Sequence, residues 1–201
     1  MKNTIMKDTI ILTVITLVSG FLLGLVNHIT EEPIAHQQQL AKEEAYAAVF
    51  EEADSFEGVS VETDLQEYVN AQGYEAQTID EIREAKDASG ETLGYVMTVT
   101  SSEGYGGDIQ FAMGVQEDGT MNGISILSIS ETAGLGMKAD TEEFKSQFAG
   151  VQTDAFEYTK DGATQDNQID ATSGATITTN AMTNGVNAGL AAFAYEKGGT
   201  Q

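Results

Sequence analysis

The chain has 201 residues, of which 41% are hydrophobic, enough for one modest folded domain with an additional segment. Nine Lys and Arg residues stand against 32 Asp and Glu residues, and the net charge of -23 opposes binding to nucleic acid and other polyanions. The lack of cysteine excludes disulfides, thiolate nucleophiles and Cys-ligated zinc or iron–sulfur sites. Any redox chemistry must therefore use a bound cofactor.

Histidine is confined to the N-terminal part of the chain, at His28 and His36. The remaining sequence has no imidazole for acid–base catalysis or metal binding, so we expect neither a hydrolase triad nor a metal site. Residues 161–170 are acidic, but their glycine is misplaced for an EF-hand loop and no terminal glutamate follows. We therefore predict no catalytic residues of the acid–base kind and no metal ligands.

An uncharged apolar stretch lies between Asp8 and Glu31. Residues 10–26 approach the roughly 20 residues that cross a bilayer as a helix. A buried core helix or a signal peptide has a similar pattern, but no small-residue cleavage site follows. We expect residues 1–30 to form a single transmembrane anchor that places the protein in the cell membrane.

The charges that flank this stretch predict its orientation. Lys2 and Lys7 precede it, whereas Glu31 and Glu32 follow it. By the positive-inside rule the N-terminus is cytoplasmic and the C-terminal domain is extracytoplasmic. Pro33 is expected to end the membrane helix where it leaves the bilayer.

Residues 31–88 are predicted to form a juxtamembrane helix and an acidic region. Small and apolar residues recur at helical spacing between residues 36 and 53. Residues 57–87 are acidic and weakly patterned, which predicts loops and short helices. We place a domain boundary at residue 88.

Residues 89–201 carry the pattern of an antiparallel sheet. Apolar and polar residues alternate over 95–100 and 109–115, as in half-buried strands. The Asp118-Gly119 turn closes a hairpin onto residues 121–129. Thr141 is expected to cap a short helix that extends to Phe148.

A longer helix is predicted after residue 176. Its apolar positions share one face, and Gly185 and Gly189 within it indicate close packing against another element. The face consists of Met182, Val186, Leu190 and Phe193. We expect an α+β fold in which an N-terminal transmembrane helix precedes an exported domain with an antiparallel sheet flanked by helices.

The sequence Asp170-Ala-Thr-Ser-Gly-Ala-Thr176 stands immediately before this last helix. A helix N-terminus with small residues offers free N–H groups and a partial positive charge to a phosphate. The same residues also suit an ordinary helix cap, in which Ser173 or Thr176 accepts a hydrogen bond from the first turn. The residues alone leave both interpretations open.

This motif resembles the Asp-x-x-Ser/Thr-Gly-Ala-Thr signature of the domain family that carries FMN covalently. The resemblance implies that Thr176 is esterified through the flavin phosphate by a separate flavin transferase, and that Asp170 serves in recognition or activation. The residues around the phosphate would be Ser173, Gly174, Ala175, Thr178 and Thr179.

Beyond the motif, nearly the whole chain resembles the G subunit of the Rnf electron transport complex. The resemblance rests on the Tyr105-Gly-Gly107 segment, the 115–120 hairpin, the 131–136 segment and the N-terminal anchor; the family usually has proline where Ala133 stands. It implies an electron relay in an ion-translocating ferredoxin:NAD oxidoreductase, with the other membrane and redox subunits as partners. The residues expected around the flavin ring are Tyr105, Gly106, Glu131, Thr132, Leu135, Gly136 and Lys138.

Three alternatives remain at this point. The C subunit of the sodium-pumping quinone reductase is also similar, but it is normally longer. The chain is also compatible with an extracytoplasmic flavoprotein of another electron chain. In the third alternative it is a non-redox membrane-anchored scaffold, and the motif before the last helix is only a cap.

Overall fold

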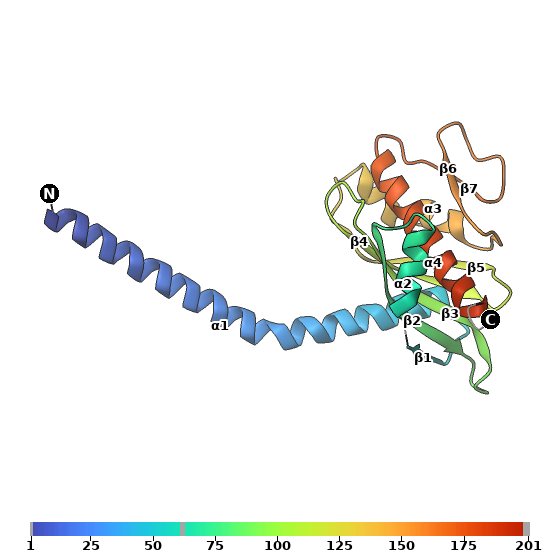
Figure 1. Cartoon of the computed structure of the whole chain (residues 1–201), viewed down its shortest axis with the longest axis horizontal. Coiled ribbons are helices and arrows are strands. Elements are labelled where there is room, and N and C mark those ends of the chain that lie inside the picture. Colours follow the sequence, from blue (N-terminus) through green and yellow to red (C-terminus); the bar gives the residue numbers. More distant parts are fainter. Residues whose placement is uncertain (1, 61–62, 199–201) are drawn as a thin grey trace. The chain divides into compact units, whose positions relative to one another are not determined.

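A computed structural model describes residues 2–60 and 63–198 of the chain (Figure 1). The chain divides into two compact units, residues 1–41 and residues 42–201. The second unit is built from an antiparallel sheet with helices on its faces. The expected α+β architecture with a long apolar N-terminal helix is confirmed.

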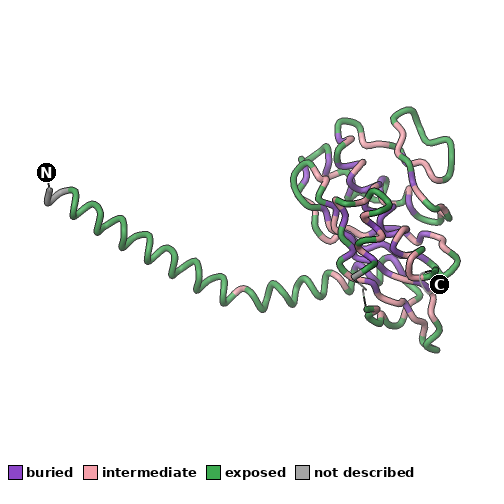
Figure 2. Tube along the Cα trace, viewed as in Figure 1, coloured by how far each residue is buried: buried purple, intermediate pink, exposed green. Residues whose placement is uncertain are grey.

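The N-terminal helix α1 spans Lys2–Val49 as one element of 48 residues. The part from Ile5 contains an 18-residue window with mean hydropathy 2.5, none of which is buried, so by length and composition the helix can cross a membrane (Figure 2). Pro33 lies inside α1, and the expectation that it ends the helix was wrong. One lost backbone hydrogen bond does not end the helix here, because the Gln, Ala, Lys and Glu residues that follow are strong helix formers.

The main sheet has five antiparallel strands in chain order. The strands predicted from alternation are confirmed, and Gly119 provides the positive φ of +89° in the turn between the last two. Strands β3 and β4 pair in register, with Val99 opposite Phe111. The five strands are β1 Ser55–Val59, β2 Gln77–Lys86, β3 Thr92–Ser101, β4 Ile109–Gln116 and β5 Met121–Ser128.

Residues 57–87 differ from the expectation of loops and short helices. They contain the short helix α2, Thr63–Ala71, but also most of β1 and all of β2. The period-two pattern of β2 is hidden because its register against β3 shifts between Ile79 and Glu81, and because the polar residue Gln77 is buried. The sheet therefore joins β2 to β3 across residue 88.

The last helix, α4, spans Thr176–Gly198 and packs with α2 against one face of the sheet. The predicted close approach at its glycines is confirmed. A Cβ added at Gly185 would lie 2.9 Å from two ring carbons of Phe111, and one added at Gly189 would collide with the sulfur of Met113. Both neighbouring side chains are fully buried in the core.

The other face of the sheet is covered by the end of α1. Tyr46 and Phe50 are buried there against Ala85, Val96 and Ala112. A Cβ added at Gly114 of β4 would lie 2.9 Å from the carbonyl oxygen of Val49, so the helix end rests directly on the sheet. Residues 42–50 therefore belong to the folded unit and not only to the apolar helix.

A polar network fixes the same helix end. Glu81 accepts hydrogen bonds from Lys42 at 2.9 Å, from Tyr46 at 3.0 Å and from Arg83 at 2.6 Å. The Tyr46 hydroxyl also bonds to Thr98 at 2.9 Å. Burial alone would raise the pKa of Glu81, but the three hydrogen bonds outweigh it and lower that pKa.

Short elements connect β5 to α4: η1 Gly136–Asp140, α3 Glu142–Lys145, η2 Ser146–Phe148, β6 Glu157–Thr159 and β7 Gln168–Asp170. The short helix before residue 148 is therefore present, but its expected cap is not. The Thr141 hydroxyl instead donates to the carbonyl oxygen of Lys138 at 2.6 Å, which also accepts the Thr141 N–H at 3.0 Å at the end of η1. Strands β6 and β7 pair in parallel.

Candidate functional site

The motif loop, residues 170–175, leads from β7 into α4, which begins at Thr176. Gly174 has a positive φ of +77°, a conformation that glycine adopts without strain. The first N–H groups of an α-helix have no partner within the helix and carry partial positive charge. In this loop the chain therefore presents helix N–H groups beside small side chains.

The hydroxyl groups of the motif have distinct roles. Thr179 is almost fully buried, and its Oγ1 donates to the Ala175 carbonyl at 3.0 Å and accepts from the Thr172 N–H at 3.2 Å. Thr179 thus stabilises the loop from the first turn of α4, whereas the cap interpretation had Ser173 or Thr176 accept an N–H of that turn. Within residues 2–60 and 63–198, the hydroxyls of Ser173 and Thr176 form no hydrogen bond.

A cavity of about 540 Å³ adjoins the start of α4. Three of its lining residues are large, apolar and exposed: Tyr105 at 72%, Leu135 at 42% and Ile177 at 52%. Among the described residues of the unit 42–201, these three are the only large hydrophobic side chains that are exposed. The full lining is Tyr105, Glu131, Thr132, Leu135, Gly136, Gly174, Ala175, Thr176, Ile177 and Thr178.

Glu131 connects two of the segments that form this cavity. It is only 9% exposed, and its Oε1 accepts hydrogen bonds from the backbone N–H groups of Tyr105 at 2.7 Å and Gly106 at 3.3 Å. A Cβ added at Gly136 would lie 2.6 Å from both Glu131 Oε2 and Thr178 Oγ1. Glycine at 136 is therefore what allows both polar side chains to pack closely against the backbone in the cavity wall.

A second cavity, of about 420 Å³, involves the other part of the motif loop. It is lined by Lys138, Asp170 and Ser173 together with residues of α3. The carboxylate of Asp170 accepts the N–H of Ala163 at 2.6 Å, and its own N–H donates to the side chain of Gln147 at 2.6 Å. Lys138 is the single Lys or Arg among the residues that line the two cavities.

The structure thus brings most of the predicted site residues together. Eight of them line the first cavity with Thr176, whereas Asp170, Ser173 and Lys138 line the second. Gly106 adjoins the first cavity through Glu131, and Thr179 lies beneath the loop in the core. Sequence reasoning missed Ile177, although a large apolar residue beside three threonines at a helix start was a usable signal.

Comparison with known proteins relates this geometry to a family. Residues 104–191 match the model of the FMN-binding domain, and residues 1–49 match the model of the RnfG N-terminal region. The chain is 32% identical to the G subunit of the proton-translocating ferredoxin:NAD(+) oxidoreductase complex of Clostridium ljungdahlii, over 92% of this chain and 89% of that protein. The chain belongs to the RnfG family. The resemblance seen in the sequence is confirmed.

A second relative agrees with this assignment, and a solved structure shares the fold. The G subunit of the Na(+)-translocating ferredoxin:NAD(+) oxidoreductase complex of Acetobacterium woodii is 31% identical to this RnfG chain, over 95% of the chain and 92% of the relative. The crystal structure of Shewanella oneidensis NqrC matches with a TM-score of 0.52 at 19% identity, over 73% of this chain and 70% of that one. The match to NqrC supports the fold alone.

Proposed function

We propose that this RnfG chain is the electron-relay component of a membrane-bound, ion-translocating ferredoxin:NAD oxidoreductase complex, with one FMN joined to Thr176 by a phosphodiester bond. The observation that carries the proposal is the first cavity. The exposed large apolar side chains of the described folded unit gather around it, beside a threonine hydroxyl that has no hydrogen-bond partner. A flat apolar ring system would cover the three side chains.

The residues of the site fit both ends of an FMN molecule. The N–H groups at the start of α4 are donors suited to a phosphate, and Gly174 and Ala175 leave the Thr176 hydroxyl open. Leu135, Ile177 and Tyr105 offer apolar surface to the ring. Thr178 is largely buried, but its hydroxyl forms no hydrogen bond within the described residues and is accessible in the same cavity as a further polar partner.

An electron relay requires little chemistry from the chain itself. FMN, when bound, supplies transfer of one or two electrons. The chain orients it and sets the surrounding charge. Lys138, beside the motif loop, contributes positive charge that favours an anionic reduced form in a protein whose net charge is -23. No side chain is assigned as an acid–base catalyst.

The remaining parts of the proposal concern place and partners. The apolar part of α1 anchors the chain, with the N-terminus in the cytoplasm and the flavin domain, which includes residues 89–201, on the extracytoplasmic side. The orientation rests on Lys2 and Lys7 before the span and Glu31 and Glu32 after it. The partners are the other subunits of the complex and, during maturation, a flavin transferase that recognises Asp170 in the motif loop.

The test is covalent flavin on the full chain, produced together with a flavin transferase. After denaturing electrophoresis the wild-type band should fluoresce, and its intact mass should increase by one FMN less water. Thr176→Ala should be colourless, whereas Thr164→Ala, in an exposed loop away from both cavities, should retain full fluorescence. A wild-type chain without the added mass, or a Thr176→Ala chain that keeps it, would overturn the proposed attachment.

A further inference from the structure

The loop that carries Tyr105, residues 102–108, contains three glycines and has little intrinsic rigidity. Contacts with neighbouring segments must therefore hold the Tyr105 ring at the rim of the first cavity. One such contact is at the tip of the loop, where Glu131 accepts the N–H groups of Tyr105 and Gly106. At its base, the N–H and the hydroxyl of Ser102 both donate to the Ala76 carbonyl at 2.9 Å. Glu103, which does not line the cavity, makes further contacts at the base.

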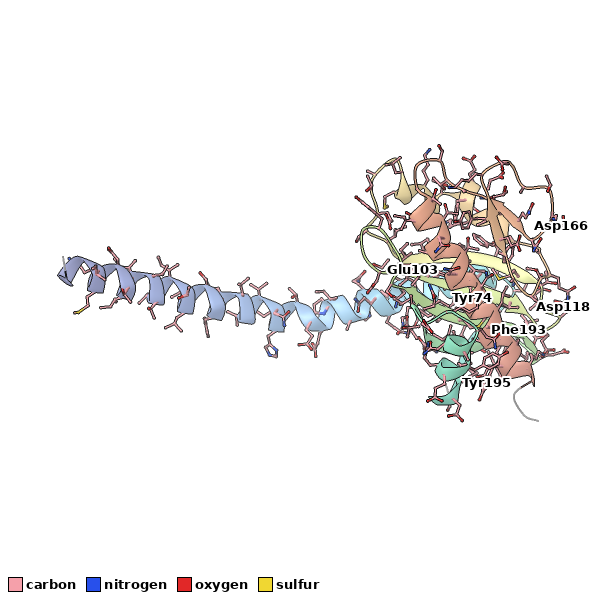
Figure 3. The ribbon with its side chains drawn as sticks, turned by 45° about the horizontal axis from the view of Figure 1, so that its top comes forward. Tyr74, Glu103, Asp118, Asp166, Phe193 and Tyr195 are labelled. Carbon is pink, nitrogen blue, oxygen red and sulfur yellow. The ribbon has the colours of Figure 1, made fainter. Side chains whose placement is uncertain are left out.

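Glu103, which is labelled in Figure 3, forms hydrogen bonds that connect the loop to two separate elements of the core. Its Oε2 accepts the side-chain N–H of Gln77, at the start of β2, and that of Asn184, in the third turn of α4, each at 2.7 Å. Gln77 is only 2% exposed and also bonds to Ser101 at the end of β3. A single carboxylate oxygen thus fixes the base of the loop to the sheet and to the helix that begins at Thr176.

Space around the loop is limited. A Cβ added at Gly104 would collide with the carbonyl oxygen of Gly107 and would lie 3.0 Å from Glu131 Oε1. A Cβ added at Gly106 would collide with the carbonyl oxygen of Ser130. The loop is therefore packed against the segment that precedes Glu131, and its path depends on both carboxylates.

We propose that Glu103 is a positioning residue of the flavin site, which holds the Tyr105 ring over the cavity through its hydrogen bonds to Gln77 and Asn184. This inference rests on the proposed function. Hydrogen bonds to a charged acceptor stabilise a closed loop over an open one by roughly 10- to 100-fold each. Without Glu103 the loop opens, the ring leaves the rim, and water reaches the flavin.

The experiment compares Glu103→Ala, Glu103→Gln and Tyr105→Ala in the full chain carrying covalent flavin. The readouts are the reduction potential of the flavin and the quenching of its fluorescence by iodide. Glu103→Ala should shift the potential in the same direction as Tyr105→Ala and increase iodide quenching. Glu103→Gln keeps an acceptor oxygen but loses the charge, so it should lie between the wild type and Glu103→Ala in both readouts.

A double variant tests whether Glu103 acts through Tyr105. If it does, Glu103→Ala with Tyr105→Ala should shift the potential no further than Tyr105→Ala alone. Additive shifts, an unchanged Glu103→Ala protein, or a Glu103→Gln protein as altered as Glu103→Ala would each overturn the proposal. If Glu103→Ala fails to fold, Asn184→Ala replaces it, because this variant removes only the hydrogen bond between Glu103 and α4. An unchanged flavin potential in Asn184→Ala would also overturn the proposal.

A flavin-free measurement keeps this inference separate from the proposed attachment. Hydrogen exchange of the Tyr105 and Gly106 amides can be measured on the full chain produced without a flavin transferase. These amides should exchange roughly 10-fold faster or more in Glu103→Ala than in the wild type, because the loop opens. If these amides exchange faster in Glu103→Ala but the chain never accepts flavin, only the proposed function is overturned. If their exchange in Glu103→Ala is unchanged, the proposed role of Glu103 is overturned.

Discussion

Replacing Gly136 by alanine tests how the wall of the first cavity is built. The added Cβ would lie 2.6 Å from both Glu131 Oε2 and Thr178 Oγ1, whereas non-bonded heavy atoms normally stay about 3.5 Å apart. Both side chains are largely buried and line the cavity, so relief of the clash displaces them toward the cavity. Glu131 must move by about 1 Å, and its bond to the Tyr105 N–H, now 2.7 Å, is lost.

The expected change in the free energy of unfolding of Gly136→Ala follows from two opposing effects. Overpacking costs about 1–3 kcal/mol, and the reduced freedom of the unfolded chain returns about 0.4–1 kcal/mol. The net expectation is a loss of about 1–2 kcal/mol in the free energy of unfolding. The backbone at Gly136 is not in the left-handed region, so strain in φ adds nothing.

The assay is urea unfolding of the full chain in detergent, together with iodide quenching of the covalent flavin. Gly134→Ala is the matched control, because Gly134 has φ of +77° and nothing within 4 Å of an added Cβ. It should lose about 1–2 kcal/mol through backbone strain while its flavin signal stays unchanged. A Gly136→Ala protein with wild-type stability and wild-type quenching would refute this reasoning.

Three further predictions concern stability of the same unit. Asn187→Ala should cost about 2–4 kcal/mol in urea unfolding, because the buried Asn187 amide bonds both the N–H and the carbonyl of Phe156 and both would lose their partner; a loss below that of an exposed control substitution would contradict it. Gly185→Ala should destabilise by up to about 2 kcal/mol, since the clash with the Phe111 ring exceeds the gain in helix propensity. An unfolding midpoint at or above that of the wild type would refute the clash. Because the pKa of Glu81 is lowered by folding, its contribution is present above the unfolded pKa of about 4.3 and is lost as pH falls through the folded value. Glu81→Gln should therefore flatten the acid limb of the stability–pH curve, and an unchanged limb would exclude this origin.

Much of the second unit was readable from the sequence because its residues follow simple periods. The alternation over 95–129 and the helical spacing after residue 176 report which side chains face the core, and the structure confirms both. Strand β2 was missed because alternation fails where a strand shifts register, as it does between Ile79 and Glu81. Its charged residues are also satisfied by partners distant in the chain, such as Lys42, which no local pattern reveals.

The candidate site was partly predictable for a different reason. Glycine-rich segments at element ends mark places where backbone approaches something closely, and the segments at 103–108, 131–138 and 170–179 do meet around neighbouring cavities. The sequence did not predict which of several similar residues forms which contact. Thr179 closes the loop, whereas the Thr176 hydroxyl forms no hydrogen bond to any residue that the structure describes, and only the three-dimensional contacts distinguish the two hydroxyls.

The end of α1 has a practical consequence for anyone trimming this protein to a water-soluble fragment. Residues 42–50 fill one side of the sheet, where Tyr46 and Phe50 cover Ala85, Val96 and Ala112. Cutting the chain after residue 50 would expose an apolar patch on the sheet and promote aggregation. A fragment that starts between residues 34 and 41 lacks the most apolar part of α1 but keeps residues 42–50. It is therefore the natural starting point for crystallisation.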